Sequence, residues 1–209
     1  MTELPAIPDS ALVAEATELV RTAASPLIYH HSRRVYYFGA LRGAASGLRY
    51  DPEILYVSAM FHDLGLTRRY RSGNQRFEID GADEARRFLR AHGIADCLAE
   101  LAWTGIALHT TPEIPLHMAP EIALVTRGVE LDVLGIGYDA ISDGQRDAVV
   151  AEHPRPDFKR QILAAFTDGI RDRPDTTFGT VKADVLAHFV PGFRRGDFVE
   201  VIQNSAWSE

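Results

Sequence analysis

The stretch DPEILYVSAMFHDLGL, residues 51–66, decides the fold class of this 209-residue chain. The pair Asp51-Pro52 is a strong helix start, because aspartate caps free backbone N–H groups and proline fits the first turn. The residues that then recur at intervals of three and four are Leu55, Ser58, Ala59 and His62. This spacing places them on one helical face, and Gly65 is a helix stop. The stretch therefore predicts a helix whose inward stripe ends at His62, with Asp63 beside it.

Helical periodicity continues through nearly the whole chain, and no segment shows the sustained alternation of a half-buried strand. The predicted helices span about residues 10–21, 26–43, 52–63, 80–91, 96–108, 120–132, 143–152, 157–171, 177–189 and 194–203. Asp80 is the predicted N-cap of the fourth. We therefore expect an all-α fold. We expect residues 1–24 to form an N-terminal helix extension, residues 25–190 a helical-bundle domain, and residues 191–209 a C-terminal helix and tail.

The composition narrows the class of protein. Hydrophobic residues make up 46% and charged residues 24%, which fits one globular domain with a substantial core. No apolar run approaches the ~20 residues of a membrane span, and a net charge of −7 argues against nucleic acid as a partner. Cys97 is the only cysteine, so no internal disulfide can form, and residues 1–10 do not resemble a secretory leader. A cytoplasmic protein is expected.

Four side chains that can bind a metal fall on inward helical faces or at helix ends: His31, His62, Asp63 and Asp132. A buried carboxylate without a partner costs several kcal/mol, and a divalent cation would compensate it. Two imidazoles and two carboxylates suit zinc, iron or manganese and leave positions open for water. We expect one divalent ion at the centre of the bundle, with zinc as the first choice and iron or manganese as alternatives.

Other roles for these side chains stay open. The His-Asp pair could be an ordinary helix C-cap. His30 is a rival to His31, although its helical face is polar while His31 shares an apolar stripe. Asp132 could be a core acid paired with an arginine such as Arg127. The glycines about one turn on either side, Gly128 and Gly135, favour close helix approach instead.

In this order, a histidine, a His-Asp pair and a distant aspartate resemble the HD-domain metalloenzyme superfamily, an all-helical group of metal-dependent phosphohydrolases and related enzymes. Five short motifs resemble the branch that contains cyanamide hydratase: HSRRVYYFG (31–39), FHDLG (61–65), FE with GA (77–82), ALHT (107–110) and LDVLG (131–135). The resemblance covers roughly residues 25–189. It implies that the four side chains above are the metal ligands.

The resemblance also implies a hydrolase or hydro-lyase in which metal-bound hydroxide adds to a small molecule. The expected substrate class is a cyanamide-type nitrile, which would give urea. The implied catalytic residues are Glu78, His109 and Asp63, with Thr110 on the substrate side. Glu78 or His109 would move the proton that such an addition needs. Phe77 and Trp103 are the expected apolar walls of a dry pocket.

Several alternatives remain for function. In a phosphohydrolase, Arg33 or an arginine of the 68–71 segment would clamp the phosphate of the substrate. In a di-iron oxygenase, His109 and His117 would hold a second ion. A non-catalytic sensing module is the third alternative. His109 could also be only a helix cap, and Glu78 only a first-turn charge. A homo-oligomer is compatible with the resemblance and with the surface helices.

Overall fold

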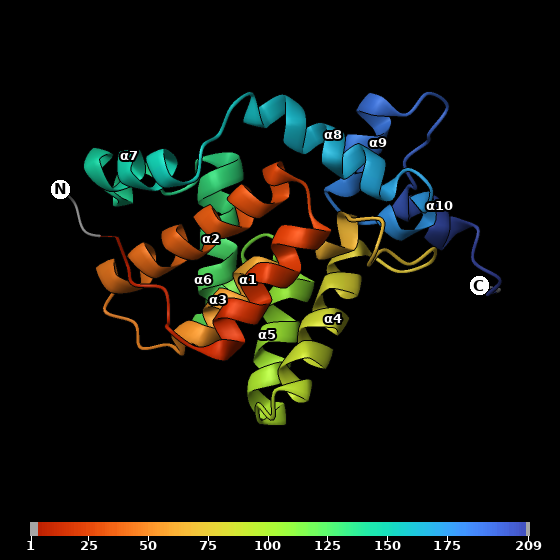
Figure 1. Cartoon of the computed structure of the whole chain (residues 1–209). Helices are drawn as coiled ribbons and strands as arrows, with labels where there is room; N and C mark the ends of the chain where they lie inside the picture. Colours follow the sequence, from red (N-terminus) through yellow and green to blue (C-terminus); the bar gives the residue numbers. More distant parts are fainter. Residues whose placement is uncertain (1–3, 208–209) are drawn as a thin grey trace.

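The computed structural model of the chain describes residues 4–207, and within that range every regular element is helical (Figure 1). The α-helices are α1 (Ala11–Ala23), α2 (Pro26–Ala45), α3 (Pro52–Phe61), α4 (Phe77–Ala91), α5 (Asp96–Leu108), α6 (Pro120–Val129), α7 (Asp143–Glu152), α8 (Phe158–Ile170), α9 (Lys182–Phe189) and α10 (Phe198–Gln203). A short 3-10 turn, Leu64–Leu66, follows α3, and a π-helical turn, Glu130–Leu134, continues α6. The predicted all-α class is confirmed.

The first three helices begin where local capping predicts. The side chains of Ser10, Ser25 and Asp51 each accept hydrogen bonds from backbone N–H groups of the turn that follows. A proline stands directly after the cap in α2 and α3, where its missing N–H costs nothing. These starts are confirmed because they depend only on residues within one helical turn.

Three predicted starts are wrong. α10 begins at Phe198 instead of residue 194, because the Asp197 side chain caps its first backbone N–H groups. α4 begins at Phe77, so Asp80 lies inside the helix and does not cap it. The Asp80 carboxylate instead accepts hydrogen bonds from the Ser72 backbone N–H, at 3.0 Å, and from Arg173. The Asp80 side chain, which the local sequence predicts as a helix cap, thus forms a long-range ion pair with Arg173 instead. α9 begins at Lys182, later than predicted, because a separate 3-10 turn occupies Pro174–Thr177.

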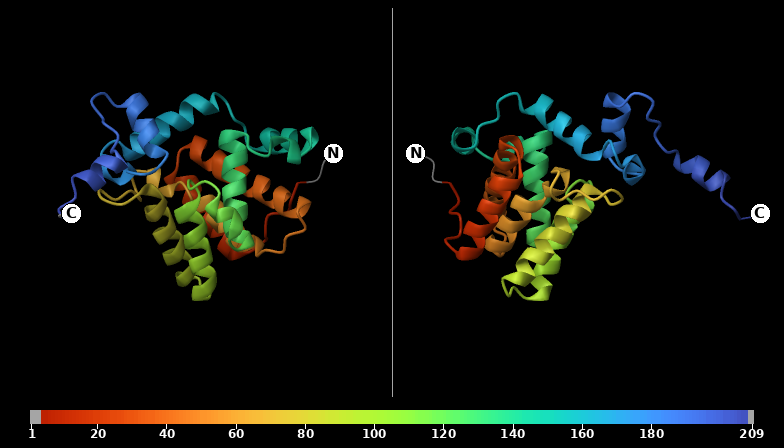
Figure 2. Two further views of the ribbon diagram at one scale, coloured as in Figure 1. Left: turned by 180° about the vertical axis from the view of Figure 1, so that it is seen from behind. Right: turned by 45° about the vertical axis from the view of Figure 1, so that its right-hand side comes forward.

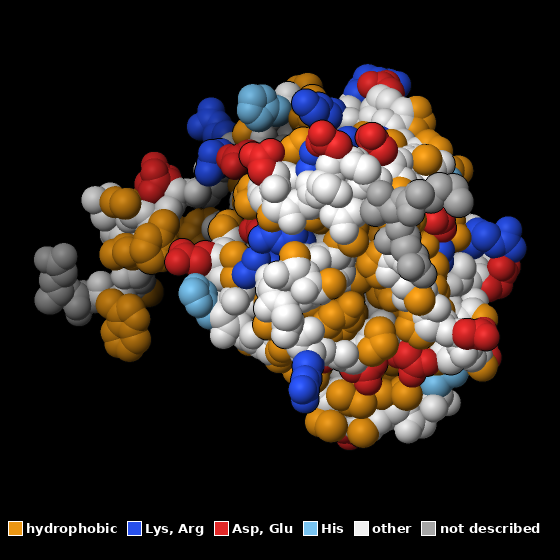
Figure 3. Space-filling view, turned by 90° about the vertical axis from the view of Figure 1, so that its left-hand side faces the viewer, with side chains coloured by type: hydrophobic (Ala, Val, Ile, Leu, Met, Phe, Trp, Pro, Cys, Tyr) orange, Lys and Arg blue, Asp and Glu red, His pale blue; other side chains and the backbone are white. Residues whose placement is uncertain are grey.

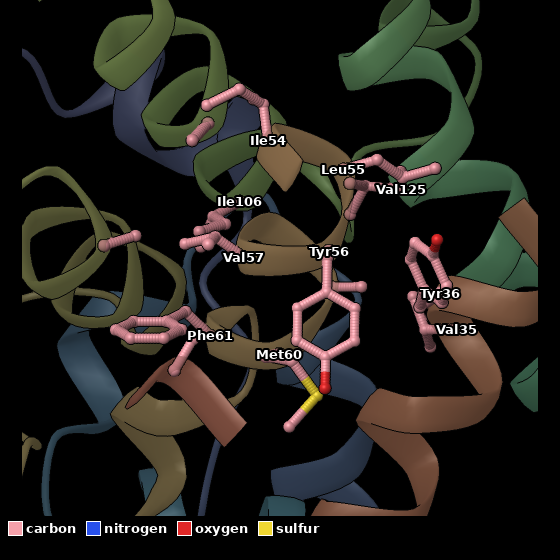
Figure 4. Packing of buried hydrophobic residues seen from close by; sticks show 14 of the residues in the cluster. Val35, Tyr36, Ile54, Leu55, Tyr56, Val57, Met60, Phe61, Ile106 and Val125 are labelled. Atoms are coloured by element: carbon pink, nitrogen blue, oxygen red, sulfur yellow. The ribbon is translucent and has the colours of Figure 1, made fainter. Parts of the chain in front are cut away.

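α3 forms the centre of the bundle, and it packs against α1, α2, α4, α5 and α6. All of its residues from Ile54 to Phe61 are buried. Figure 4 shows this packing, with Tyr56 of α3 lying near Tyr36 of α2 and Val57 near Ile106 of α5. A helix that is buried on every side explains why this segment is apolar all round.

Glycines bring α2 and α6 into close contact. A Cβ on Gly128 would overlap the backbone carbonyl oxygen of Val35, and one on Gly39 would lie 2.7 Å from that of Leu124. Only a hydrogen at these two positions lets the helix backbones approach so closely. The crossing holds the N-terminal half of α2 beside the π-helical turn after α6, which carries Asp132.

The C-terminal helices cover one end of the bundle. A second apolar cluster joins α8 and α9 to it, and its buried members are Ile28, Leu66, Phe77, Phe158, Ile162, Ile170 and Leu186. α10 projects away from the body (Figure 2). Figure 3 shows hydrophobic side chains along this arm, and its exposed apolar residues are Phe198, Val199, Val201, Ile202 and Trp207. No helix within residues 4–207 is long and apolar enough to cross a membrane.

Candidate metal centre

Three of the four predicted ligands meet in the interior of the bundle. The Nε2 atoms of His31 and His62 lie 3.1 Å apart. The Oδ2 atom of Asp63 lies 3.3 Å from Nε2 of His62 and 3.6 Å from Nε2 of His31. All three side chains are about 1% exposed, and the three donor atoms lie within 4.8 Å of one another. His31 joins this group, whereas His30 turns away and contacts His153.

Hydrogen bonds to the other ring nitrogen orient both imidazoles. His62 caps the C-terminal end of α3 and donates its Nδ1–H to the carbonyl of Ala59, at 2.7 Å. His31 donates its Nδ1–H to Oδ2 of Asp132, also at 2.7 Å. With these protons on Nδ1, both Nε2 lone pairs point into the same space. Metal-binding histidines characteristically use one nitrogen for the metal and the other for such a bond.

The three residues fit a divalent cation. Both carboxylate oxygens of Asp63 are buried and have no hydrogen-bond partner. Two ligand atoms 2.0–2.1 Å from a tetrahedral ion would lie about 3.3 Å apart, close to the separations seen here. An uncompensated buried carboxylate and two facing lone pairs are unfavourable unless a cation lies between them. This group can therefore hold a metal ion.

The protonation states suit metal binding. Burial opposes the ionisation of Asp63, but the imidazoles of His62 and His109 outweigh it and hold the carboxyl pKa well below its usual range. Burial lowers the pKa of His31, partly offset by Asp132. For His62 the effect of burial is outweighed by Asp63, so its pKa is raised. A bound cation would displace any proton from these ligand atoms.

Asp132, the fourth predicted ligand, lies behind His31 and outside the group of three. Its carboxylate accepts two hydrogen bonds from Arg34, at 2.8 and 2.9 Å, and one from Nε of Arg155, at 2.9 Å. With the bond from His31, four donors surround its two oxygens. Arg127 was the arginine predicted as an alternative partner of Asp132. The arginines that bind it are instead Arg34 of α2 and Arg155 of the segment before α8.

His109 contacts the metal group at Asp63 and His62. It caps the C-terminal end of α5, and its Nδ1–H donates to the carbonyl of Ile106 at 2.6 Å. Its Nε2 is buried without a hydrogen-bond partner and lies 3.6 Å from Oδ1 of Asp63. Its ring packs edge-on against that of His62, with centroids 4.8 Å apart. His117, the candidate for a second ion, is exposed instead, with its side chain 75% accessible.

Glu78 belongs to a buried network beside this group. It accepts hydrogen bonds from the Thr110 hydroxyl, at 2.5 Å, and from Lys182. Glu78 is 2% exposed and Lys182 is fully buried. Burial opposes ionisation of Glu78, but the ammonium group of Lys182 outweighs it and lowers the carboxyl pKa. Lys182 is not among the residues predicted for the site, although it is one of only two lysines in this chain.

The remaining predicted substrate residues lie at different distances from the group. The Phe77 ring packs edge-on against His109, with centroids 5.5 Å apart. Trp103 lies between α4 and α5, where its indole N–H donates to Asp83 at 2.8 Å. Arg33 donates to the Tyr56 hydroxyl and to His153, on the far side of α2.

A cavity of about 160 Å³ opens directly onto the metal group. Its lining consists of His31, His62, Asp63, His109, Thr110, Thr111, Pro112, Val129, Glu130, Val133, Leu134, Phe166 and Val181. Most of the lining surface is apolar although seven of these thirteen residues are polar, and the lining contains no arginine or lysine. Pockets for drug-sized ligands are usually about 300–1,000 Å³. This cavity therefore suits a much smaller molecule.

The sequence profile of the HD domain matches residues 28–156, more than half of the chain. The match includes the three residues of the metal group, His109 and Asp132. Lys182 and the cavity-lining Phe166 lie beyond its end. No curated protein matches the chain.

Proposed function

Because the chain belongs to the HD domain family, whose proteins are generally metal-dependent hydrolases, we propose that it adds water to a small uncharged molecule at the metal group. A cyanamide-type nitrile, converted to urea, is the leading substrate class. One observation carries this proposal: the cavity over His31, His62 and Asp63 holds about 160 Å³ and has no arginine or lysine in its lining. Such a site favours a small neutral substrate over an anion.

When bound, a divalent ion, with zinc as our first choice, lowers the pKa of a coordinated water from 15.7 to about 7. The protein supplies the rest of the chemistry. Apolar walls such as Val133 and Phe166 exclude bulk water, which strengthens electrostatic interactions inside the cavity. Addition of water to a nitrile forms a carbon–oxygen bond and delivers a proton to the nitrile nitrogen.

Thr110 connects the cavity to the buried network behind it. Its side chain lines the cavity, and its hydroxyl donates to Glu78. Since the pKa of Glu78 is lowered, its carboxyl group is ionised and can act as an acceptor but has no proton to donate. We therefore assign Glu78 and Thr110 to orienting and relaying the proton of the attacking water, with Lys182 stabilising the carboxylate.

The alternative is phosphohydrolysis, and one feature favours it. A wider groove of about 580 Å³ adjoins the cavity at Thr110 and Thr111, and Arg76 and Arg195 are among its lining residues. Arg195 is, however, paired with Asp184 at 2.6 Å. Neither Arg33 nor the arginines of the 68–71 segment line the groove or the cavity.

Metal content and two activity assays on one sample test the proposal. Protein purified without added metal is analysed for zinc, iron and manganese, then assayed for urea from cyanamide and for phosphate from nucleotides. We expect about one metal per chain and urea formation. Phosphate release without urea would replace the proposal with phosphohydrolysis. Two irons per chain with oxygen uptake would indicate an oxygenase, and metal without turnover a sensing module.

A further inference from the structure

We propose that two copies of this chain associate by exchanging the α10 arm, residues 197–207. The arm of each copy lies in the apolar groove between α8 and α9 of the other copy. Because each copy gives one arm and receives one, the assembly closes as a symmetric dimer. The inference concerns assembly and is independent of the metal-dependent chemistry.

The α10 arm exposes an apolar face to water. None of the residues of α10 is buried, and the arm projects away from the body of the protein (Figure 2). Phe198, Val201 and Ile202 follow the three- and four-residue spacing of one helical face, and each is more than half exposed. A helix of six residues is marginal in water by itself, so it needs a surface to pack against.

The groove between α8 and α9 offers a matching apolar surface. It holds about 480 Å³, and its apolar lining residues are Leu163, Ala164 and Phe189. Leu163 is 39% exposed and Phe189 is 48% exposed, so the single chain leaves both partly uncovered. The volume is within the usual range for pockets that hold drug-sized ligands, and it can take several side chains of one helical face.

The charges of the two surfaces are complementary. Within residues 197–207 the ionisable side chains are Asp197 and Glu200, and both are acidic. The groove is lined by two arginines, Arg160 and Arg171, and by one acid, Asp168. An acidic arm favours this groove over an anionic membrane or nucleic acid, which would attract a basic arm.

The two arginines of the groove can still bind a carboxylate of the arm. Arg160 is paired with Asp157 of its own chain, and Arg171 lies 3.7 Å from Asp168. A guanidinium group has five N–H donors, so each arginine keeps donors free beyond these pairs. Both arginine side chains are at least about half exposed and are therefore accessible to a second chain.

The start of the arm is held away from the groove of its own chain. Arg195, just before the arm, pairs with Asp184 of α9 at 2.6 Å. Gly196 lies against the Phe178 ring, where an added Cβ would be 2.6 Å from a ring atom. Asp184 and the groove residue Phe189 are five residues apart, which places them about 140° apart around α9. The arm therefore leaves α9 on the side away from its own groove.

Two single variants and their mixture test the exchange. Ile202→Asp puts a charge on the apolar face of the arm, and Leu163→Asp puts one in the groove. Sedimentation velocity at micromolar concentration measures association of the full chain. We expect a dimer for the unchanged chain and, for each variant alone, a loss of dimer affinity of about 30-fold or more, as for a central interface contact. An equal mixture of the two variants should associate again, because the intact arm of Leu163→Asp fits the intact groove of Ile202→Asp.

The mixture distinguishes arm exchange from other interfaces. Pairing of arm with arm would leave Leu163→Asp dimeric, and pairing of groove with groove would leave Ile202→Asp dimeric; either result would overturn the proposal. So would a monomeric unchanged chain, or two variants that stay monomeric when they are mixed.

Controls separate lost association from misfolding. Leu48→Asp changes an exposed leucine between α2 and α3 and should leave the dimer intact. Circular dichroism must show that the variants keep the helicity of the unchanged chain. If Leu163→Asp loses helicity, Arg171→Glu at the exposed edge of the groove replaces it, since it repels the acidic arm, and the same results are expected from its mixture with Ile202→Asp.

Discussion

Lys182 of α9 donates a hydrogen bond to Glu78 of α4 in the interior of the protein, across 104 residues of sequence. Both side chains are at most 2% exposed. This ion pair connects the C-terminal helices to the wall of the metal centre. It therefore contributes both to stability and to the environment of the cavity.

Removing one partner of this pair should destabilise the fold strongly. Lys182→Met leaves the carboxylate of Glu78 buried and uncompensated, so the free energy of unfolding should fall by about 3–5 kcal/mol. Urea denaturation measures the loss. The double variant Lys182→Met/Glu78→Gln should recover part of it, because no buried charge remains. Equal losses in the single and double variants would contradict this account.

Glu78→Gln should keep the metal but slow turnover, and it should also lower the free energy of unfolding because Lys182 loses its anionic partner. The amide can still accept from the Thr110 hydroxyl, but it cannot take up a proton. If the carboxylate relays the proton, kcat should fall by about 100-fold or more, with metal content unchanged. Unchanged kinetics would return Glu78 to a structural role. Glu84→Gln, on the same helix and paired with Arg87, is the matched control.

Metal removal should lower thermal stability through Asp63. A ligand that binds only the folded state raises the unfolding temperature, so a chelator should lower the Tm of the unchanged chain. Asp63→Ala should lose the metal, the activity and the chelator effect together. Differential scanning calorimetry with and without chelator measures this. A chelator effect that persists in Asp63→Ala would place the stabilising ion elsewhere.

Stability should also fall in mild acid because of His153. Burial, with Arg33 beside it, lowers the pKa of His153 to about 4. Arg33 donates to its Nε2, so the folded chain favours the neutral ring. The unfolded chain binds the proton below about pH 6.5, so this stabilisation is complete above that pH and is lost as pH falls toward 4.

The expected loss between pH 7 and pH 5 is about 1–2 kcal/mol. Urea midpoints at the two pH values measure it. His153→Gln keeps a hydrogen-bonding group but does not titrate, so its midpoints should differ less. His117→Gln should retain the full pH dependence, since that side chain is exposed. Parallel pH dependence in both variants would assign the effect to other groups.

Gly128→Ala should weaken both the fold and the metal centre. The new methyl group would overlap the Val35 carbonyl and push α6 from α2. Overpacking of this kind costs about 1–3 kcal/mol, measurable by urea denaturation. Metal affinity should fall as well, because His31 and Asp132 lie on the two separated elements. Gly73→Ala, where a Cβ meets nothing within 4 Å, is the control and should change neither quantity.

The amino-acid sequence alone determined the helical class, most helix starts and the inward position of His31 and His62, with Asp63 beside His62. These features depend on interactions within one or two helical turns, such as the Ser25 cap and the spacing that ends at His62. The helical class, the helix starts and the inward histidines can therefore be predicted from the sequence.

Only the tertiary structure decided the partners of Asp132, Glu78 and His109. Asp132 could be placed on an inward face from its spacing, but Arg34 and Arg155 reach it only after α2 and the segment before α8 pack around it. Lys182 meets Glu78 for the same reason. Such pairings depend on how distant helices cross, and helix periodicity carries no information about which polar side chains meet at a crossing.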